Sequence, residues 1–160
     1  MSSIIVNGFN VGTEMTTVIL SSNLPGFQSV PIETLGHMKE FKADQENTEV
    51  ICTPVAYGGL RFHRNIYHDW MGTINLTRFN ATLSQMMLLI MQVFQQTGAE
   101  TYWAFFTLMN NTAAGTQDSF LFTNAVIGKH SLGNFSGTSE VDTSLAFRCQ
   151  SLTITTTQLA

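Results

Sequence analysis

The sequence predicts a mainly β fold, an antiparallel sandwich or barrel with one α-helix inserted after mid-chain. Three features indicate it. Apolar and polar residues alternate over long stretches with the two-residue period of strands, glycine and asparagine turn signals recur, and only one segment has helical spacing. The chain has 160 residues, enough for one domain with a substantial core, so we assign residues 1–160 to a single domain.

The first strands are expected before residue 37. The segment from Ile4 to Val11 contains Asn7-Gly8, a pair that supplies the positive φ angles of a type I′ turn, and it predicts a hairpin. Thr16–Ser22 is rich in β-branched residues and predicts the next strand. Leu24–Gly36 contains two prolines and two glycines, which predict a long loop.

Charge is concentrated in the segment that follows. A third of all Lys, Arg, Asp and Glu residues lie within it, namely Lys39, Glu40, Lys42, Asp44, Glu46 and Glu49. Strand-like pieces at 41–44 and 49–52 predict a charged hairpin or projecting loop, because charges of mixed sign keep such an element solvated. Two roles stay open for it, a solvated surface loop and a specific docking element.

A clear strand precedes the helix. Four residues of one face alternate with four of the other: Trp70, Gly72, Ile74 and Leu76 against Met71, Thr73, Asn75 and Thr77. This pattern predicts one buried face and one polar, uncharged face.

The one helix is predicted from Ala81 to about residue 97. Asn80 or Thr82 can cap its start, and Gly98 stands where a left-handed residue would end it. Its apolar residues occupy roughly 200° of arc, which is wider than one packing face needs. The helix contains no charged residue. We therefore expect one side to pack on the sheet and another to lie near a neighbouring subunit, with a helix buried in its own domain as the alternative.

Three strands are predicted after the helix. Thr101–Met109 is rich in aromatic residues, and Thr143–Thr156 forms the last strand. Between them, Ser119–Lys129 is apolar on both faces, which is typical of a central strand. Alternation places its residues in two groups: Phe120, Phe122 and Val126 on one face, and Leu121, Ala125 and Ile127 on the other.

The low charge of the chain indicates that its surface is covered by other subunits. Hydrophobic residues make up 44% of the sequence but charged residues only 11%, where soluble domains carry about 25%. Interface cores are depleted in charge, whereas the surface of a free monomer is not. A monomer with a surface rich in Ser, Thr and Asn is the alternative. The net charge of −4 and the absence of a basic cluster argue against tight nucleic-acid binding.

Signals for export, membranes and chemistry are absent from the sequence. The N-terminus has no basic region or long apolar run, and Met86–Met91 is far shorter than the roughly 20 residues of a membrane span. We therefore expect Cys52 and Cys149 to be reduced, buried thiols. No hydrolase, phosphate-loop or metalloprotease motif occurs.

The strongest metal candidate is the group His63, His68 and Asp69. Two histidines five residues apart on one strand point to opposite faces, so they cannot share a metal without a bulge between them. We predict no enzyme activity, no cofactor and no metal. A small β-barrel enzyme or ligand binder that uses this group remains the rival from another class.

Several features together resemble bacteriophage tail tube proteins, a family that shares its fold with the Hcp tube protein of type VI secretion. The order of elements is similar, and the stretch from His68 to Arg78 looks like the strand that leads into the family's helix. The passage from Gly133 to Phe147 is similar to the glycine-polar turn and the strand after it near the end of many tube subunits.

The resemblance implies a structural subunit that forms stacked hexameric rings. Hairpins from six subunits would join into one continuous β-barrel, whose lumen conducts DNA without specific binding during genome ejection. Implied partners are copies of the chain, sheath, tape measure and baseplate proteins, in a virion tail assembled from protein made in the host cytoplasm. The alternatives are another self-assembling virion component, such as a tail terminator, baseplate or capsid decoration protein, and an Hcp-type secretion tube.

Two sets of residues are candidates for these roles. Lumen-facing residues are expected to be polar or acidic: Asp44, Glu46, Thr73, Asn75 and Thr77. Residues between subunits are expected in the charged segment and on the polar side of the helix: Lys39, Glu40, Lys42, Glu49, Leu88, Gln92 and Gln95.

Overall fold

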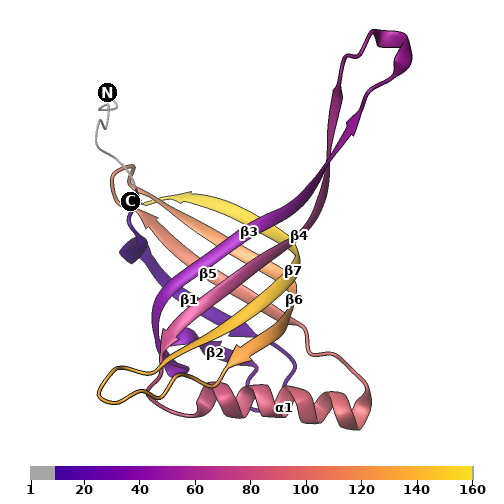
Figure 1. The fold of residues 1–160 in the computed structure, drawn as a ribbon. Coiled ribbons are helices and arrows are strands. Elements are labelled where there is room, and N and C mark those ends of the chain that lie inside the picture. Colours follow the sequence, from indigo (N-terminus) through magenta and orange to yellow (C-terminus); the bar gives the residue numbers. More distant parts are fainter. Residues whose placement is uncertain (1–9, 160) are drawn as a thin grey trace.

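The computed structural model describes residues 10–159 (Figure 1). Its strands and single helix follow in the order β1 (Met15–Ser21), β2 (Ser29–Pro31), β3 (His37–Cys52), β4 (Phe62–Thr77), α1 (Thr82–Thr97), β5 (Trp103–Asn111), β6 (Thr116–Ser131) and β7 (Asp142–Gln158). The prediction of a mainly β fold with one helix is confirmed. The hairpin predicted around Asn7-Gly8 lies outside the described residues, except for its last two positions, which are not in a strand.

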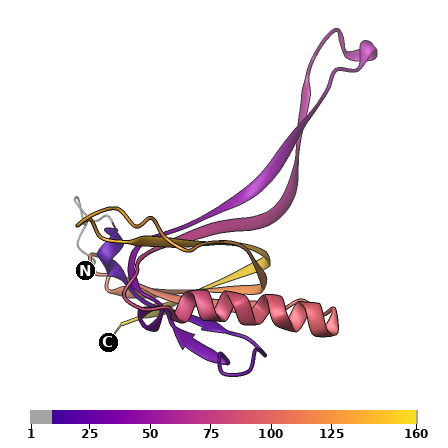
Figure 2. The same ribbon diagram turned by 60° about the horizontal axis from the view of Figure 1, so that its bottom comes forward.

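All seven strands form one open antiparallel sheet in the order β2-β1-β5-β6-β7-β4-β3. The sheet is strongly curved. Phe41 of β3 lies 5.9 Å from Phe122 of β6, ring centre to ring centre, although a flat sheet would separate these strands by about 14 Å. The sheet therefore folds over and packs its own inner face together (Figure 2).

The long strands divide this sheet into two half-sheets. β4 pairs with β7 only from Trp70 to Thr77, and β5 pairs with β6 only up to Ala125. We call the part made of residues 126–131, 142–149, 70–77 and 37–45 the polar half-sheet. The part made of β1, β2, β5 and residues 116–125 and 150–158 is the β1 half-sheet.

β6 and β7 pass from one half-sheet to the other at a corner marked by Asn124 and Gln150. Asn124 has a positive φ of 53°, and its side-chain amide donates to Gln150 Oε1 at 2.9 Å. Phe122 and Ala125 are both buried, although strict alternation would place them on opposite faces. The predicted grouping of the β6 side chains was therefore wrong, because the corner changes the phase of the alternation.

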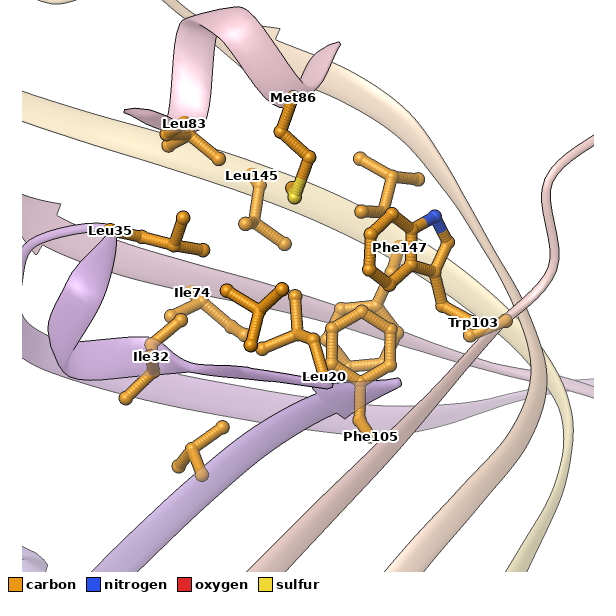
Figure 3. Close-up of a cluster of buried hydrophobic side chains, with 14 of the residues drawn as sticks. Leu20, Ile32, Leu35, Ile74, Leu83, Met86, Trp103, Phe105, Leu145 and Phe147 are labelled. Carbon is orange, nitrogen blue, oxygen red and sulfur yellow. The ribbon is translucent and has the colours of Figure 1, made fainter. Parts of the chain in front are cut away.

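The inner face of the curved sheet forms one core (Figure 3). Phe147 stacks on Phe105 with ring centres 4.5 Å apart, and Ile74 and Leu145 are fully buried beside them. The predicted buried face of β4 is thus confirmed. Gly72 belongs to the same face, and its missing side chain leaves the space that the Phe147 ring fills.

The segment predicted as a loop, 24–36, contains more structure than expected. Val30 lies in β2, the short edge strand, and Leu35 follows a 3-10 turn at Ile32–Thr34. Both side chains are buried. Pro31 is tolerated in β2 because an edge strand does not need every backbone N–H for its ladder.

Helix α1 covers one end of the core (Figures 1 and 2). Gly98 adopts the left-handed conformation, so the predicted end of the helix is confirmed. Its start differs: the N-cap is Ala81, which makes no side-chain cap hydrogen bond, and Asn80 Oδ1 instead accepts the N–H of Thr82 at 3.0 Å from one residue before the cap. Leu83 and Met86 are the buried residues of the helix. Within residues 10–159, no helix has the length and apolarity to cross a membrane.

Candidate assembly surface

The hairpin of β3 and β4 extends far beyond the sheet (Figures 1 and 2). We call residues 46–69 the arm. The side chains of residues 46–53 and 58–69 are all exposed, so the arm adds no buried residue of this stretch to the core. The charged segment does project from the body, but the prediction that it forms a hairpin by itself was wrong. Residues 41–44 and 49–52 both lie in the single strand β3, and the hairpin is formed with β4.

One face of the arm is mostly apolar. Strand pairing sets Val50 opposite Arg64, Thr48 opposite Ile66 and Cys52 opposite Phe62, and alternation places these six residues on one face. Val50 is 44% exposed and Ile66 46%. An exposed apolar face on a projecting hairpin is typical of a contact with another molecule.

The base of the arm carries charge. Arg148 of β7 donates to Glu46 at 3.2 Å, and Lys42 lies 3.6 Å from Asp44. All of these side chains are at least 45% exposed, so each ion pair contributes little to stability. The pairing of β3 with β4 is irregular at this point, since its register shifts between Gln45 and Asn47.

The outer face of the polar half-sheet has uncharged polar side chains on β4. Charged side chains flank them, namely Glu40, Lys42 and Asp44 on β3 and Arg148 on β7. Thr73, Asn75 and Thr77 are half-buried and lie opposite the core. Asn75 donates to Glu40 at 3.2 Å. A hollow of about 550 Å³ opens on this face, because small residues such as Ala146 and Gly128 form its floor.

Both edges of the polar half-sheet are unpaired among the described residues. On one side, residues 126–131 of β6 extend past the last pair with β5. On the other side, β3 pairs only with β4 along its whole length. Each edge therefore presents backbone N–H and C=O groups that another strand can pair with.

The helix leaves an apolar stripe uncovered. Leu88 is 54% exposed, and Met91 and Phe94 are each 49% exposed. The alternative of a helix buried within its own subunit is therefore wrong. Gln92 and Gln95 are exposed beside this stripe.

The candidate residues lie in three separate places. Thr73, Asn75, Thr77, Glu40, Lys42 and Asp44 share the polar half-sheet, Glu46 and Glu49 lie on the arm, and Leu88, Gln92 and Gln95 lie on α1. Lys39 contacts Glu140 and lies 3.3 Å from Asp142. These two acceptors raise the pKa of Lys39, Glu140 most strongly.

The sequence reading missed the apolar face of the arm and the state of Cys52. Cys52 is exposed on the arm, so the expectation of two buried thiols was wrong for it, whereas Cys149 is buried. Burial, and more weakly the charge of Asp69, raises the pKa of Cys149 to about 11. The available signal was weak: Val50 and Cys52 are two positions apart, but Arg64 stands between Phe62 and Ile66 on the same face.

The histidine group does not converge. His63 Nδ1 lies 2.5 Å from a carboxylate oxygen of Glu49, while His68 Nε2 lies 2.9 Å from the hydroxyl of Thr48. These contacts are on opposite faces of the arm. Within residues 10–159, no three His, Cys, Asp or Glu side chains are arranged to hold a metal ion.

The sequence matches no protein-family model and no curated protein significantly. Solved structures do match. A chain of the sheath–tube complex of the extracellular contractile injection system PVC has a TM-score of 0.63 at 12% identity, and the match covers 96% of this chain and 95% of that one. A chain of the anti-feeding prophage cap, described as its tube terminating cap, has a TM-score of 0.63 at 18% identity, covering 98% and 97%.

A third match comes from the tail of an empty gene transfer agent particle, refined with C6 symmetry. Its TM-score is 0.52 at 14% identity, and the match covers 92% of this chain and 99% of that one. All three matches span nearly the whole length of both chains. The chain therefore has a tail-tube-like fold, shared with subunits of phage-like tails and contractile injection systems.

Proposed function

We propose that this chain is the structural subunit of a tail tube, assembled as stacked hexameric rings around a lumen that conducts DNA. The observation that carries the proposal is the polar half-sheet with its two unpaired edges. A neighbouring copy can pair its β3 edge with residues 126–131 of β6, and each repetition of this contact adds one subunit to the ring.

The number of strands suits this contact. In the polar half-sheet the order β6-β7-β4-β3 alternates in direction, so β3 runs antiparallel to β6. Because each copy contributes four strands, β3 of one copy meets β6 of the next copy in antiparallel orientation. The same contact can then repeat around the ring with every subunit in the same orientation. An odd number of strands would place parallel strands at every junction.

The face of this half-sheet away from the core would line the lumen. Thr73, Asn75 and Thr77 supply hydroxyl and amide groups there, and Asp44 and Glu46 add negative charge near the arm. Lys42 and Arg148 also lie on this face, but each is paired with a carboxylate, Asp44 or Glu46. Such a surface offers no unpaired basic cluster to retain phosphate, so DNA passes without specific binding. The exposed helix stripe would face neighbouring subunits or other tail proteins such as the sheath.

The match to the tube terminating cap favours one second candidate, a tail terminator. A terminator would use the same edges to close one ring but would not stack. Both candidates place the chain in the tail of a phage or phage-like particle, as a structural part with no enzymatic role.

Negative-stain electron microscopy of the purified protein, at low and high concentration, tests the proposal. Hollow tubes with six-fold end views are expected, whereas single rings would favour the terminator. Compact particles at all concentrations, or closed shells, would contradict both.

The lumen assignment has its own test in an Asn75→Cys variant that also carries Cys52→Ser. In unassembled protein, Asn75→Cys should react with a small maleimide and with a large polyethylene-glycol maleimide. In tubes it should react only with the small reagent, because the large one cannot enter the lumen. Equal labelling of tubes by both reagents would place Asn75 outside the channel.

A further inference from the structure

A second unpaired edge lies in the β1 half-sheet. β7 pairs with β4 only as far as Cys149, because β4 turns away into the arm at Trp70. From Gln150 to Gln158, β7 pairs with β6 on one side, and no strand within residues 10–159 pairs with it on the other. This edge is therefore created by the departure of the arm.

The direction of the backbone groups along this edge follows from one hydrogen bond. The N–H of Leu159 donates to the carbonyl of Gly115, on the β6 side, at 3.0 Å. Because the direction of the N–H group alternates along a strand, the N–H groups of Thr157 and Thr155 also point to β6, whereas those of Thr156 and Ile154 point to the open side.

The open edge lacks the features that protect sheet edges from pairing. Its nine residues, Gln-Ser-Leu-Thr-Ile-Thr-Thr-Thr-Gln, include no charge and no proline. Ile154, on the core side opposite Phe120, is 57% exposed. A long, uncharged edge with an exposed apolar side chain is one that another strand covers.

The arm supplies a matching strand. Its β4 part, residues 63–69, has backbone pairing with β3 only and is close in length to the open edge. The same two strands already pair antiparallel in the body, where β4 meets the first half of β7. The arm of the same chain curves away from this edge (Figures 1 and 2), so the matching strand has to come from another copy.

We propose that the arm of a second copy adds as an antiparallel strand, through its β4 edge, to residues 150–158 of β7. The inference rests on the proposed function in requiring that copies assemble, and it adds a contact separate from the ring-closing edges. Each copy then carries one donor, the arm, and one acceptor, the β7 edge, so the contact repeats head to tail. A register that places Ile66 on the same face as Ile154 buries apolar surface of both.

A proline at position 156 tests the backbone contact. Thr156→Pro removes an N–H that points to the open edge and leaves the hydrogen bonds to β6 intact, so the variant should fold. It should require an at least about ten times higher protein concentration to assemble, which is the loss of affinity expected for one or two hydrogen bonds. Thr156→Val is the matched control. It also loses the 2.7 Å hydrogen bond to Asp118 but keeps the N–H, and it should assemble like the wild type. Equal assembly of the two variants would overturn the inference.

Cross-linking tests the same contact without a proline. Two chains are mixed and assembled, both with Cys52→Ser, one with Asn65→Cys on the arm and the other with Thr155→Cys beside the open edge. A short bismaleimide should join them into dimers, at several times the yield obtained when Thr155→Cys is replaced by Glu33→Cys, an exposed position away from the edge. Equal yields in assembled protein would overturn the inference.

The outcomes separate this inference from the tube proposal. Hollow tubes without the selective cross-link would refute the arm contact alone. Open fibres or chains that give the selective cross-link would support the arm contact and refute the tube. Protein that remains monomeric at every concentration would refute both.

Discussion

Replacing Gly72 by alanine would place a methyl group where the core has no space. A β-carbon built on Gly72 would lie 2.3 Å from Cζ of Phe147 and 2.7 Å from the carbonyl oxygen of Lys42. Both distances are far below van der Waals contact. The Phe147 ring cannot move aside freely, because Phe105 stacks on it and Phe41 and Phe122 lie within 6.0 Å, centre to centre.

The magnitude follows from opposing terms. Overpacking a core costs about 1–3 kcal/mol, and disturbing an aromatic pair costs a further 0.5–1.5 kcal/mol or so. Removing a glycine from a strand gains back roughly 0.5–1 kcal/mol. At the middle of these ranges, the free energy of unfolding of Gly72→Ala should fall by about 2 kcal/mol, which corresponds to a Tm lower by roughly 4–8 °C.

Urea denaturation followed by circular dichroism measures this loss, with Gly128→Ala as the matched control. A β-carbon on Gly128 meets no atom within 4 Å, and Gly128 also lies in a strand, so that variant should be unchanged or more stable by up to about 1 kcal/mol. The double variant Gly72→Ala/Phe147→Leu should be more stable than the sum of the single effects by about 0.5–3 kcal/mol. The explanation fails if Gly72→Ala is as harmless as Gly128→Ala, or if the two changes are additive.

Three further predictions follow from the helix, the cysteines and one carboxylate. Met86→Ala should lower the free energy of unfolding by about 2–5 kcal/mol, whereas Leu88→Ala should change it by less than about 0.5 kcal/mol, because Met86 is buried and Leu88 is exposed. If urea denaturation gives similar losses of unfolding free energy for the two variants, the placement of the helix is contradicted. In unassembled native protein, a thiol reagent at mildly alkaline pH should modify Cys52 quickly and Cys149 only after unfolding, because burial raises the pKa of Cys149 to about 11; rapid reaction of two thiols per chain would be inconsistent with this. Glu14 accepts the N–H groups of Thr112 and Val11 at 2.9 Å, which lowers its pKa below the ordinary 4.5. The stabilising effect of this carboxylate is present above about pH 4.5 and is lost as the pH falls through the lowered pKa. The loss of unfolding free energy in Glu14→Gln, measured by urea denaturation, should therefore be largest at neutral pH and shrink in acid, and a loss that is the same at all pH values would refute this explanation.

Local patterns in the sequence predicted most of the elements. The alternation of Trp70–Thr77 identified a strand with one polar face, and Gly98 identified the end of the helix. These signals depend on neighbouring residues along the chain, so they are readable without a structure. They failed at Asn124, where a corner changes the phase of the alternation. They also failed at Val30, because the prolines near and within its short strand, Pro25 and Pro31, are typical of a loop.

The candidate surface was predicted only in part. The shortage of charge indicated that other subunits cover this chain, and the charged segment indicated the arm. The apolar face of the arm was not recognised, because Val50 and Cys52 lie ten or more residues from Phe62 and Ile66, and only strand pairing places them together. The exposure of Cys52 was missed for the same reason.

The sequence by itself determined the class of fold, the position of the helix, the polar face of β4 and the low surface charge, since each depends on composition or on periods of two and 3.6 residues. The tertiary structure decided which edges stay unpaired. That outcome depends on where β4 leaves β7 at Trp70 and where β5 stops beside β6 at Ala125. Pairing between strands distant in the chain is set by the curvature and packing of the whole sheet, and no local pattern encodes it.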